Sequence, residues 1–137
     1  MKKIIEILKK SNKKALKTGE IPVSAVILKD GKIISCAFNN RMKKNNVMGH
    51  AEIIAIQKAS KKLKTWILDE CEMIVTLEPC EMCKEVIKQS RIKKVQYFLG
   101  NNKKINYKTS FEQVDYENDG EINYFESELK KFFENMR

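Results

Sequence analysis

The chain is poor in the residues that usually interrupt a domain, with two prolines and five glycines among its 137 residues. No proline- or glycine-rich linker and no internal repeat divides it, so we expect residues 1–137 to form a single domain. No apolar run approaches the roughly 20 residues of a membrane span, and the first residues lack the continuous apolar segment of a signal peptide. We therefore expect a cytoplasmic protein without a membrane partner.

Cysteine and tryptophan are also scarce. Four cysteines could form two disulfides, but two of them share a Cys-x-x-Cys motif and no secretory signal precedes them, so reduced thiols are expected. We interpret Cys36 and Cys71 as ordinary core or boundary residues. Trp66 and Phe98 are interpreted as core residues, although an exposed aromatic ring would be able to stack on a base.

Acidic side chains are few, at 18 against 27 basic ones, for a net charge of +9. Residues 111–137 hold eight acidic and three basic side chains and so carry −5, which leaves +14 on residues 1–110. A basic body favours a polyanionic partner such as RNA. Lysine supplies 24 of the 27 basic residues, however, so a general compositional bias explains the charge equally well.

Hydrophobic periodicity predicts the order αββαβαβ(β)α along the chain. The predicted helices cover about 2–18, 49–63 and 79–91, and a final amphipathic helix carries Phe125, Leu129, Phe132, Phe133 and Met136. The predicted strands cover 22–28, 32–38, 72–78 and 94–100, with one weak strand near 111–116. Helices that alternate with strands in this way predict a layered α/β domain in which helices cover a sheet.

The only histidine, His50, opens one predicted helix, and Cys80 and Cys83 open another. A Cys-x-x-Cys alone is often structural zinc or redox-active, and a lone histidine is often a helix cap. Together they form a three-ligand zinc set, and three protein ligands leave the fourth position of Zn²⁺ open, as in catalytic rather than structural sites. We predict one zinc ion per chain, with Glu52 beside it as a free carboxylate that shuttles protons.

Six segments together are similar to one known family. They are Glu20–Val26, Phe38–Arg41, His50–Ile53, Thr76–Cys83, Ser90–Ile92 and Phe132–Phe133. The pattern H-x-E…P-C-x-x-C marks the zinc nucleobase deaminases, and the surrounding residues resemble the tRNA adenosine deaminases, which convert the wobble adenosine of a tRNA anticodon to inosine.

The resemblance implies a three-layer α/β/α sandwich with a central mixed β-sheet. Members of the family are usually homodimers, and the expected partner is a tRNA anticodon loop. It implies that His50, Cys80 and Cys83 bind zinc, that zinc-bound hydroxide attacks C6 of the base, and that Glu52 moves the protons. It further implies that Asn39 contacts the flipped nucleoside and that the Ala51 backbone N–H orients the base.

Some positions depart from the family pattern. Ser24 stands where glycine is usual, Lys84-Glu85 replaces small residues, and Gly100–Lys104 replaces a glycine-rich segment, with Asn101 where aspartate is usual. The change at Gly100–Lys104 falls in a region expected near nucleic acid and so bears on the substrate more than on the chemistry. A deaminase of a free base or nucleoside, with guanine or cytosine as candidates, is the alternative. A non-catalytic zinc or RNA-binding module is a third possibility, against which the free carboxylate of Glu52 argues.

Overall fold

The computed structural model describes residues 1–100 and 109–135. The predicted order of elements is confirmed, and the weak segment near residue 111 does form a strand. Asn101 and Met136, which the sequence analysis singled out, lie outside the described residues. The elements are α1 (Lys2–Lys17), β1 (Ser24–Lys29), β2 (Lys32–Phe38), α2 (Ala51–Leu63), β3 (Cys71–Leu77), α3 (Glu81–Gln89), β4 (Lys94–Leu99), β5 (Ser110–Gln113), a 3₁₀ turn (Tyr116–Asn118) and α4 (Asp119–Glu134).

The five strands form one mixed sheet in the order β2-β1-β3-β4-β5. Strand β1 pairs antiparallel with both β2 and β3, whereas β3, β4 and β5 run parallel. A two-residue turn joins β1 to β2, and Asp30 and Gly31 both have the positive φ that such a hairpin turn requires. Helix α3 makes the crossover between the parallel strands β3 and β4, as parallel pairing demands.

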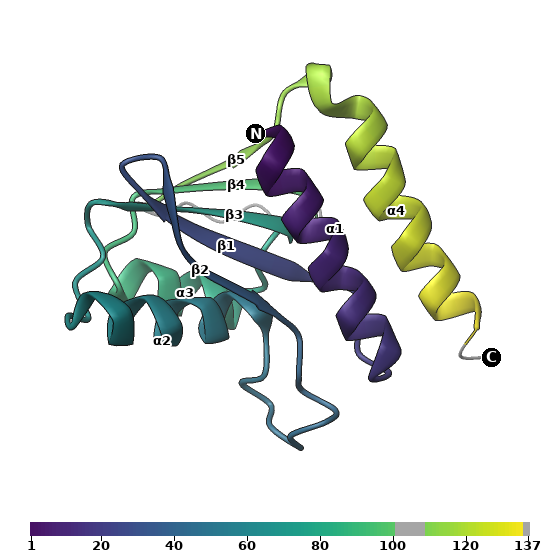
Figure 1. Ribbon diagram of the computed structural model, residues 1–137, viewed down its shortest axis with the longest axis horizontal. Helices are drawn as coiled ribbons and strands as arrows, with labels where there is room; N and C mark the ends of the chain where they lie inside the picture. Colours follow the sequence, from purple (N-terminus) through teal and green to yellow (C-terminus); the bar gives the residue numbers. More distant parts are fainter. Residues whose placement is uncertain (101–108, 136–137) are drawn as a thin grey trace.

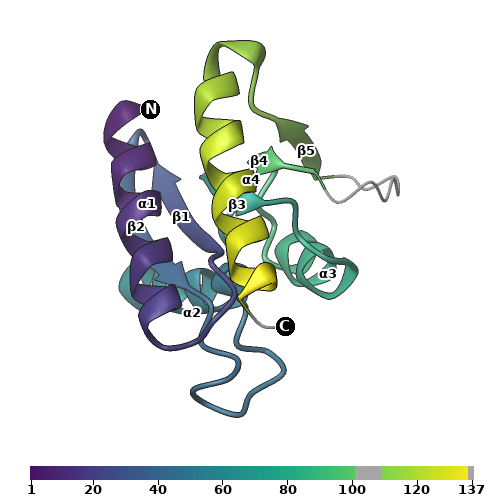
Figure 2. The same cartoon turned by 90° about the vertical axis from the view of Figure 1, so that its right-hand side faces the viewer.

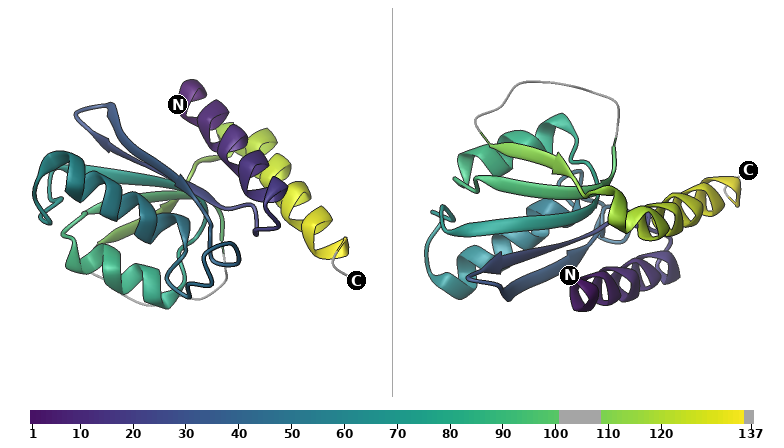
Figure 3. Two further views of the ribbon diagram at one scale, coloured as in Figure 1. Left: turned by 60° about the horizontal axis from the view of Figure 1, so that its bottom comes forward. Right: turned by 90° about the horizontal axis from the view of Figure 1, so that it is seen from above.

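Helices cover both faces of this sheet, so the predicted three-layer α/β/α architecture is confirmed. Helices α2 and α3 lie together on one face, and α1 and α4 lie side by side on the other (Figure 1, Figure 2). The view from above shows the pair α1 and α4 projecting past one end of the sheet (Figure 3). No helix in residues 1–100 or 109–135 is long and apolar enough to cross a membrane.

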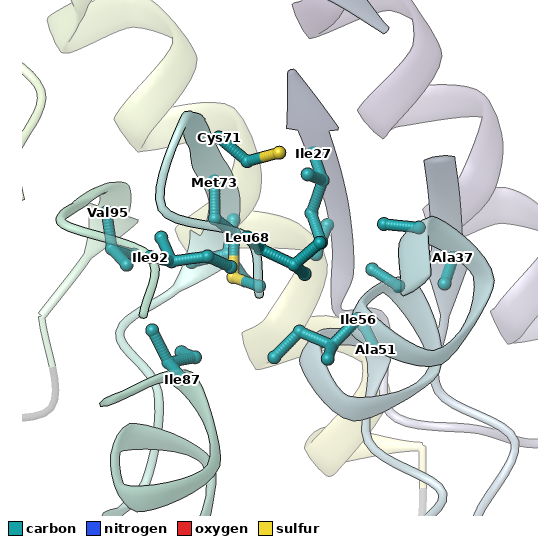
Figure 4. Close-up of a cluster of buried hydrophobic side chains, with 14 of the residues drawn as sticks. Ile27, Ala37, Ala51, Ile56, Leu68, Cys71, Met73, Ile87, Ile92 and Val95 are labelled. Carbon is teal, nitrogen blue, oxygen red and sulfur yellow. The ribbon is translucent and has the colours of Figure 1, made fainter. Parts of the chain in front are cut away.

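Each face of the sheet has its own apolar core, because successive strand residues point to opposite sides. Figure 4 shows the core beneath α2 and α3, where Ile27 and Met73 of the sheet face Ile87 of α3. On the other face, Phe98 of β4 packs against Phe125 of α4 with ring centroids 5.0 Å apart. The expectation that Phe98 is a core residue is confirmed, since its side chain is completely buried.

Trp66 was expected in the core, and this prediction was wrong: 60% of its surface is exposed. Helix α2 ends at Leu63, the backbone of the next residue, Lys64, is left-handed, and the chain turns away from the core before Leu68 becomes buried. The Trp66 ring lies instead beside the guanidinium group of Arg91, 5.7 Å from the ring centroid. The two remaining cysteines agree with their prediction as core or boundary residues, because Cys71 is buried and Cys36 is half-buried.

Helix α4 is held against α1 by polar contacts as well as by the Phe98 core. Asn12 Nδ2 donates to Glu128 Oε1 at 2.8 Å, and Lys9 Nζ lies 2.8 Å from Glu121 Oε2. The acidic C-terminal stretch therefore packs against the basic first helix. Beneath α1, the hydroxyl of the buried Ser24 donates to the Leu8 carbonyl at 3.0 Å, so a serine is accommodated where the family usually has glycine.

Candidate metal centre and its pocket

Three side chains with metal-ligand chemistry meet where β3 ends and the helices α2 and α3 begin. His50 is the N-cap residue of α2 and Cys80 is the N-cap residue of α3, both with extended backbones. Cys83 lies in the first turn of α3, one turn from Cys80. Sequence spacing brings Cys80 and Cys83 together, and the packing of α2 beside α3 on one face of the sheet (Figure 1) brings His50, the N-cap of α2, to them.

The separations of the donor atoms suit a tetrahedral metal ion. His50 Nδ1 lies 3.5 Å from Cys83 Sγ and 3.9 Å from Cys80 Sγ, and the three donor atoms all lie within 4.8 Å of one another. With ordinary zinc–sulfur and zinc–nitrogen bonds, tetrahedral ligand atoms are about 3.6 Å apart. Two thiolates and an imidazole also match the preference of Zn²⁺. Within residues 1–100 and 109–135, no other histidine, cysteine and carboxylate groups form such a cluster.

Without a metal, the three ligands share protons among themselves. The hydrogen bond from Cys83 and then that from His50 lower the pKa of Cys80 to about 3. The same contact with Cys80 raises the pKa of Cys83, with burial adding to it, and the hydrogen bond to Cys80 also raises the pKa of His50. Metal binding requires Cys80 and Cys83 as thiolates and His50 as a neutral imidazole, so it is favoured by rising pH.

Glu52 lies one residue inside α2 and is almost completely buried, with 3% of its surface exposed. Burial raises the pKa of its carboxyl group to about 7. Its Oε1 atom has no hydrogen-bond partner in the described part of the chain. Burying a carboxyl oxygen without a hydrogen-bond partner costs free energy of folding. Buried groups of this kind, with shifted pKa values, are frequent at sites that act on a ligand.

A pocket of about 450 Å³ opens beside these residues. Its walls come from distant parts of the chain: the segment before β1, the loop after β2, the start of α3 and the end of α4. The side chains that line it include Asn39, Arg41, Glu78, Phe132 and Phe133, with His50, Glu52 and Cys80 at the metal centre. A volume of this size is in the range of small-molecule sites.

Asn39 and Ala51, the two predicted substrate contacts, contact each other. The Ala51 backbone N–H donates to Asn39 Oδ1 at 2.8 Å, so this N–H group already has an acceptor within the protein. The bond fixes the orientation of the Asn39 amide, whose Nδ2 group has no partner in the described residues and remains able to donate to a ligand in the pocket. The role predicted for the Ala51 N–H therefore requires a ligand to compete with Asn39.

The pocket-lining loop of residues 39–49 is fixed by a buried carboxylate that sequence reasoning missed. Glu20 accepts hydrogen bonds from the backbone N–H groups of Met42 at 2.9 Å and Lys43 at 2.7 Å. Gly49 closes the loop, where a Cβ atom would lie 2.6 Å from Asn40 Oδ1 and leave no room for a side chain. The sequence shows Glu20 only as part of a family segment and carries no sign of a partner twenty residues away.

Known proteins resemble this chain in sequence and in fold. Residues 1–99 match the family model of the cytidine and deoxycytidylate deaminase zinc-binding region. The tRNA-specific adenosine deaminase of Aquifex aeolicus (strain VF5) is 43% identical over 91 residues, which cover 66% of this chain and 60% of that protein. The match spans 55–63% of the length of the bacterial relatives and 6% of the chloroplastic tRNA(adenine(34)) deaminase of Arabidopsis thaliana.

Two solved structures share the fold. One comes from studies of A-to-I editing by tRNA:A34 deaminases at the wobble position of transfer RNA. It superimposes with a TM-score of 0.72 at 26% sequence identity, and the match covers 80% of this chain and 95% of that chain. The other is a guanine deaminase from Bacillus subtilis, with a TM-score of 0.63 at 38% identity, covering 69% of this chain and 63% of that one. The solved structures that share this fold thus include one from studies of tRNA deaminases and one guanine deaminase.

Proposed function

The chain belongs to the family of the cytidine and deoxycytidylate deaminase zinc-binding region, and from that premise we propose that it hydrolyses the amino group of the wobble adenosine in a tRNA to give inosine. The observation that carries the proposal is the pairing of an open three-ligand metal set with a buried carboxyl group, Glu52, at the edge of one pocket. A closed structural zinc site needs no such carboxylate. We take residues 1–137 as one deaminase domain.

Each side chain has a defined part in this reaction. His50, Cys80 and Cys83 would hold Zn²⁺, which supplies an activated water at neutral pH when bound. Glu52 takes one proton from the attacking water and delivers it to a ring nitrogen, then takes the second water proton and delivers it to the amine, which leaves as ammonia. A pKa of about 7 lets the same carboxyl group take and give a proton near neutral pH. Asn39 donates from its Nδ2 group to the base, in an orientation that the Ala51 N–H fixes.

Three features favour RNA as the substrate. The curated relatives at 41–45% identity are tRNA adenosine deaminases. Residues 1–110 carry a charge of +14, which attracts a polyanion. Arg41 lies in the pocket wall, where a guanidinium group is placed to contact a phosphate next to the flipped nucleotide.

Deamination of free guanine is the second candidate, and the likeness to the Bacillus subtilis guanine deaminase at 38% identity favours it. A free base needs no phosphate contact, so the charge of the protein would then have no part in binding. The zinc ligands and Glu52 serve both reactions and do not separate them.

A direct assay separates the two candidates. The zinc-loaded protein is incubated with an anticodon stem-loop that carries a wobble adenosine, and separately with free guanine and free cytosine, and inosine and ammonia are measured. We expect inosine in the stem-loop and little ammonia from the free bases. Efficient turnover of a free base, with an unmodified stem-loop at low salt, would replace the first proposal with the second.

We further infer a homodimer located in the cytoplasm. Three large apolar side chains of the 39–49 loop, Met42, Val47 and Met48, are more than half exposed and give a partner subunit a surface to cover, and Met42 also lines the pocket. Light scattering on the purified protein measures the mass directly. A monomer at micromolar concentration would contradict the dimer without affecting the chemistry.

A further inference from the structure

Lys84 is an unexpected residue for its position, because it is charged and nevertheless buried. It follows Cys83 in the first turn of α3, where the resembled family has small residues, and its side chain is only 5% exposed. Burying an ammonium group is costly unless a counter-charge and hydrogen bonds compensate it. A helix N-terminus also carries partial positive charge, which disfavours a lysine there. Something specific must offset these costs.

The compensation comes from the carboxylate of Glu78. Lys84 Nζ donates to Glu78 Oε2 at 2.6 Å, and both side chains are at least nine-tenths buried. The ammonium group also lies 5.1 Å from the centroid of the Phe111 ring, a favourable cation–π distance. Charge-assisted hydrogen bonds this short are among the stronger side-chain contacts in proteins.

The two partners flank the metal-binding turn. Glu78 precedes Cys80 by two residues, and Lys84 follows Cys83 directly. The Glu78 backbone N–H donates to the Leu99 carbonyl at 2.7 Å, which fixes one end of the turn to the end of β4. The Lys84 backbone N–H donates to the Cys80 carbonyl at 2.9 Å, which fixes the other end to the helix. The side-chain ion pair therefore joins the two ends of the segment that carries both thiolates.

We propose that Lys84 is a positioning residue, which through its ion pair with Glu78 holds Cys80 and Cys83 at metal-binding separation. The proposal rests on the proposed function only in taking His50, Cys80 and Cys83 as the zinc ligands. Cys80 is the exposed ligand and lies farther from His50 than Cys83 does, at 3.9 Å against 3.5 Å. Its position therefore depends most on the fixed ends of the turn. Contacts outside the ligand set control metal affinity in this way at other sites.

A purely structural ion pair would stabilise the fold without any particular effect on the metal. Zinc release into an excess of a chelator, compared with the melting temperature of the zinc-free protein, distinguishes the two roles. The test variants are Lys84→Met, Glu78→Gln and their double variant. The control is Ile87→Val, which removes one methyl group from the completely buried core side of the same helix and leaves the ion pair intact.

We expect Lys84→Met to release zinc roughly 10- to 100-fold faster than the unaltered protein, the range seen when a supporting contact of a metal site is lost. Ile87→Val should lower the melting temperature but leave zinc release nearly unchanged. In the Lys84→Met background, Glu78→Gln should cause no further acceleration, because the two residues act as one unit. If Lys84→Met does not fold, Glu78→Gln carries the test, with a smaller acceleration expected since an amide oxygen still accepts from Lys84.

Two results would overturn the proposal: an unchanged release rate in Lys84→Met, or acceleration in Ile87→Val as large as in Lys84→Met at equal loss of melting temperature. Both readouts are independent of deamination. A protein that binds zinc tightly but leaves every stem-loop unmodified would contradict the proposed function and leave the role of Lys84 standing.

Discussion

Replacing Glu52 by glutamine should separate chemistry from folding more cleanly than any other substitution in this protein. Glutamine keeps the volume of a side chain that is 97% buried but cannot accept and return a proton. General acid–base groups contribute about 10²- to 10⁴-fold in rate, so the rate of a single turnover should fall by at least about 10²-fold, or roughly 2.7 kcal/mol in the activation barrier.

Folding should not suffer, because the native carboxyl group contributes little to stability. Its Oε1 atom lacks a hydrogen-bond partner in the described residues, and a buried polar group left without a partner costs about 1–3 kcal/mol. Loss of the charge is therefore expected to leave the free energy of unfolding unchanged or to raise it. Zinc content should stay near one ion per chain, since Glu52 is not among the three clustered ligands.

The assay is single-turnover deamination of an anticodon stem-loop, with urea unfolding and elemental analysis on the same preparation. Near-normal turnover in a folded, zinc-loaded variant would refute the assignment of Glu52 as proton shuttle. Loss of zinc together with activity would show instead that Glu52 helps to hold the metal. Glu52→Ala, which leaves a cavity, should lose as much activity and some stability besides.

Three further outcomes are expected. Elemental analysis of Cys83→Ala should show that most of the zinc is lost. Cys71→Ala, which replaces a buried cysteine outside the His50, Cys80 and Cys83 cluster, should keep its zinc. Full zinc occupancy in Cys83→Ala would remove Cys83 from the ligand set. Binding of an anticodon stem-loop should weaken steeply with salt, with log K falling by somewhat under one unit per unit of log salt for each phosphate neutralised, while any binding of guanine should hardly change; equal salt responses would contradict a phosphate-based mode of binding. Burial raises the pKa of the Glu128 carboxyl group in the folded protein above its value in the unfolded chain. The free energy of unfolding is therefore not reduced by this group below the pKa of the unfolded chain, and it falls as the pH rises through the pKa of the folded protein. Glu128→Gln should therefore match the unaltered protein in urea unfolding at pH 4 and exceed it modestly at pH 7, and a variant that is less stable at pH 7 would show that the ionised carboxylate is needed by Asn12.

The sequence predicted well those features that depend on local periodicity. Cys80 and Cys83 had to share a helix face, and the continuous apolar run of β1 suits a strand that is buried on both faces of the sheet. Trp66 was placed wrongly because composition says that tryptophan is buried on average, whereas the left-handed residue Lys64 turns the chain away from the core just before it.

The contacts that the sequence could not predict join residues through tertiary packing. Glu20 caps a loop twenty residues later, and nothing near it in sequence indicates that loop. Lys84 was noticed as an unusual residue, but its partner Glu78 follows only from the way the strand end and the helix start face each other. Both contacts depend on how elements distant in sequence are placed against each other, and a single sequence does not specify this placement.

The wall that Phe132 and Phe133 give to the pocket has a consequence for the order in which the site is built during synthesis. The proposed metal ligands, the last of which is Cys83, are synthesised about fifty residues before these two rings. Helix α4, which carries the rings, then has to dock against α1, which is made first, by way of Asn12 and Glu128. Contacts of such large sequence separation form late in folding. The proposed ligands are therefore all present well before the pocket is complete, because its wall forms only when residue 133 has been added and the last helix has packed against the first.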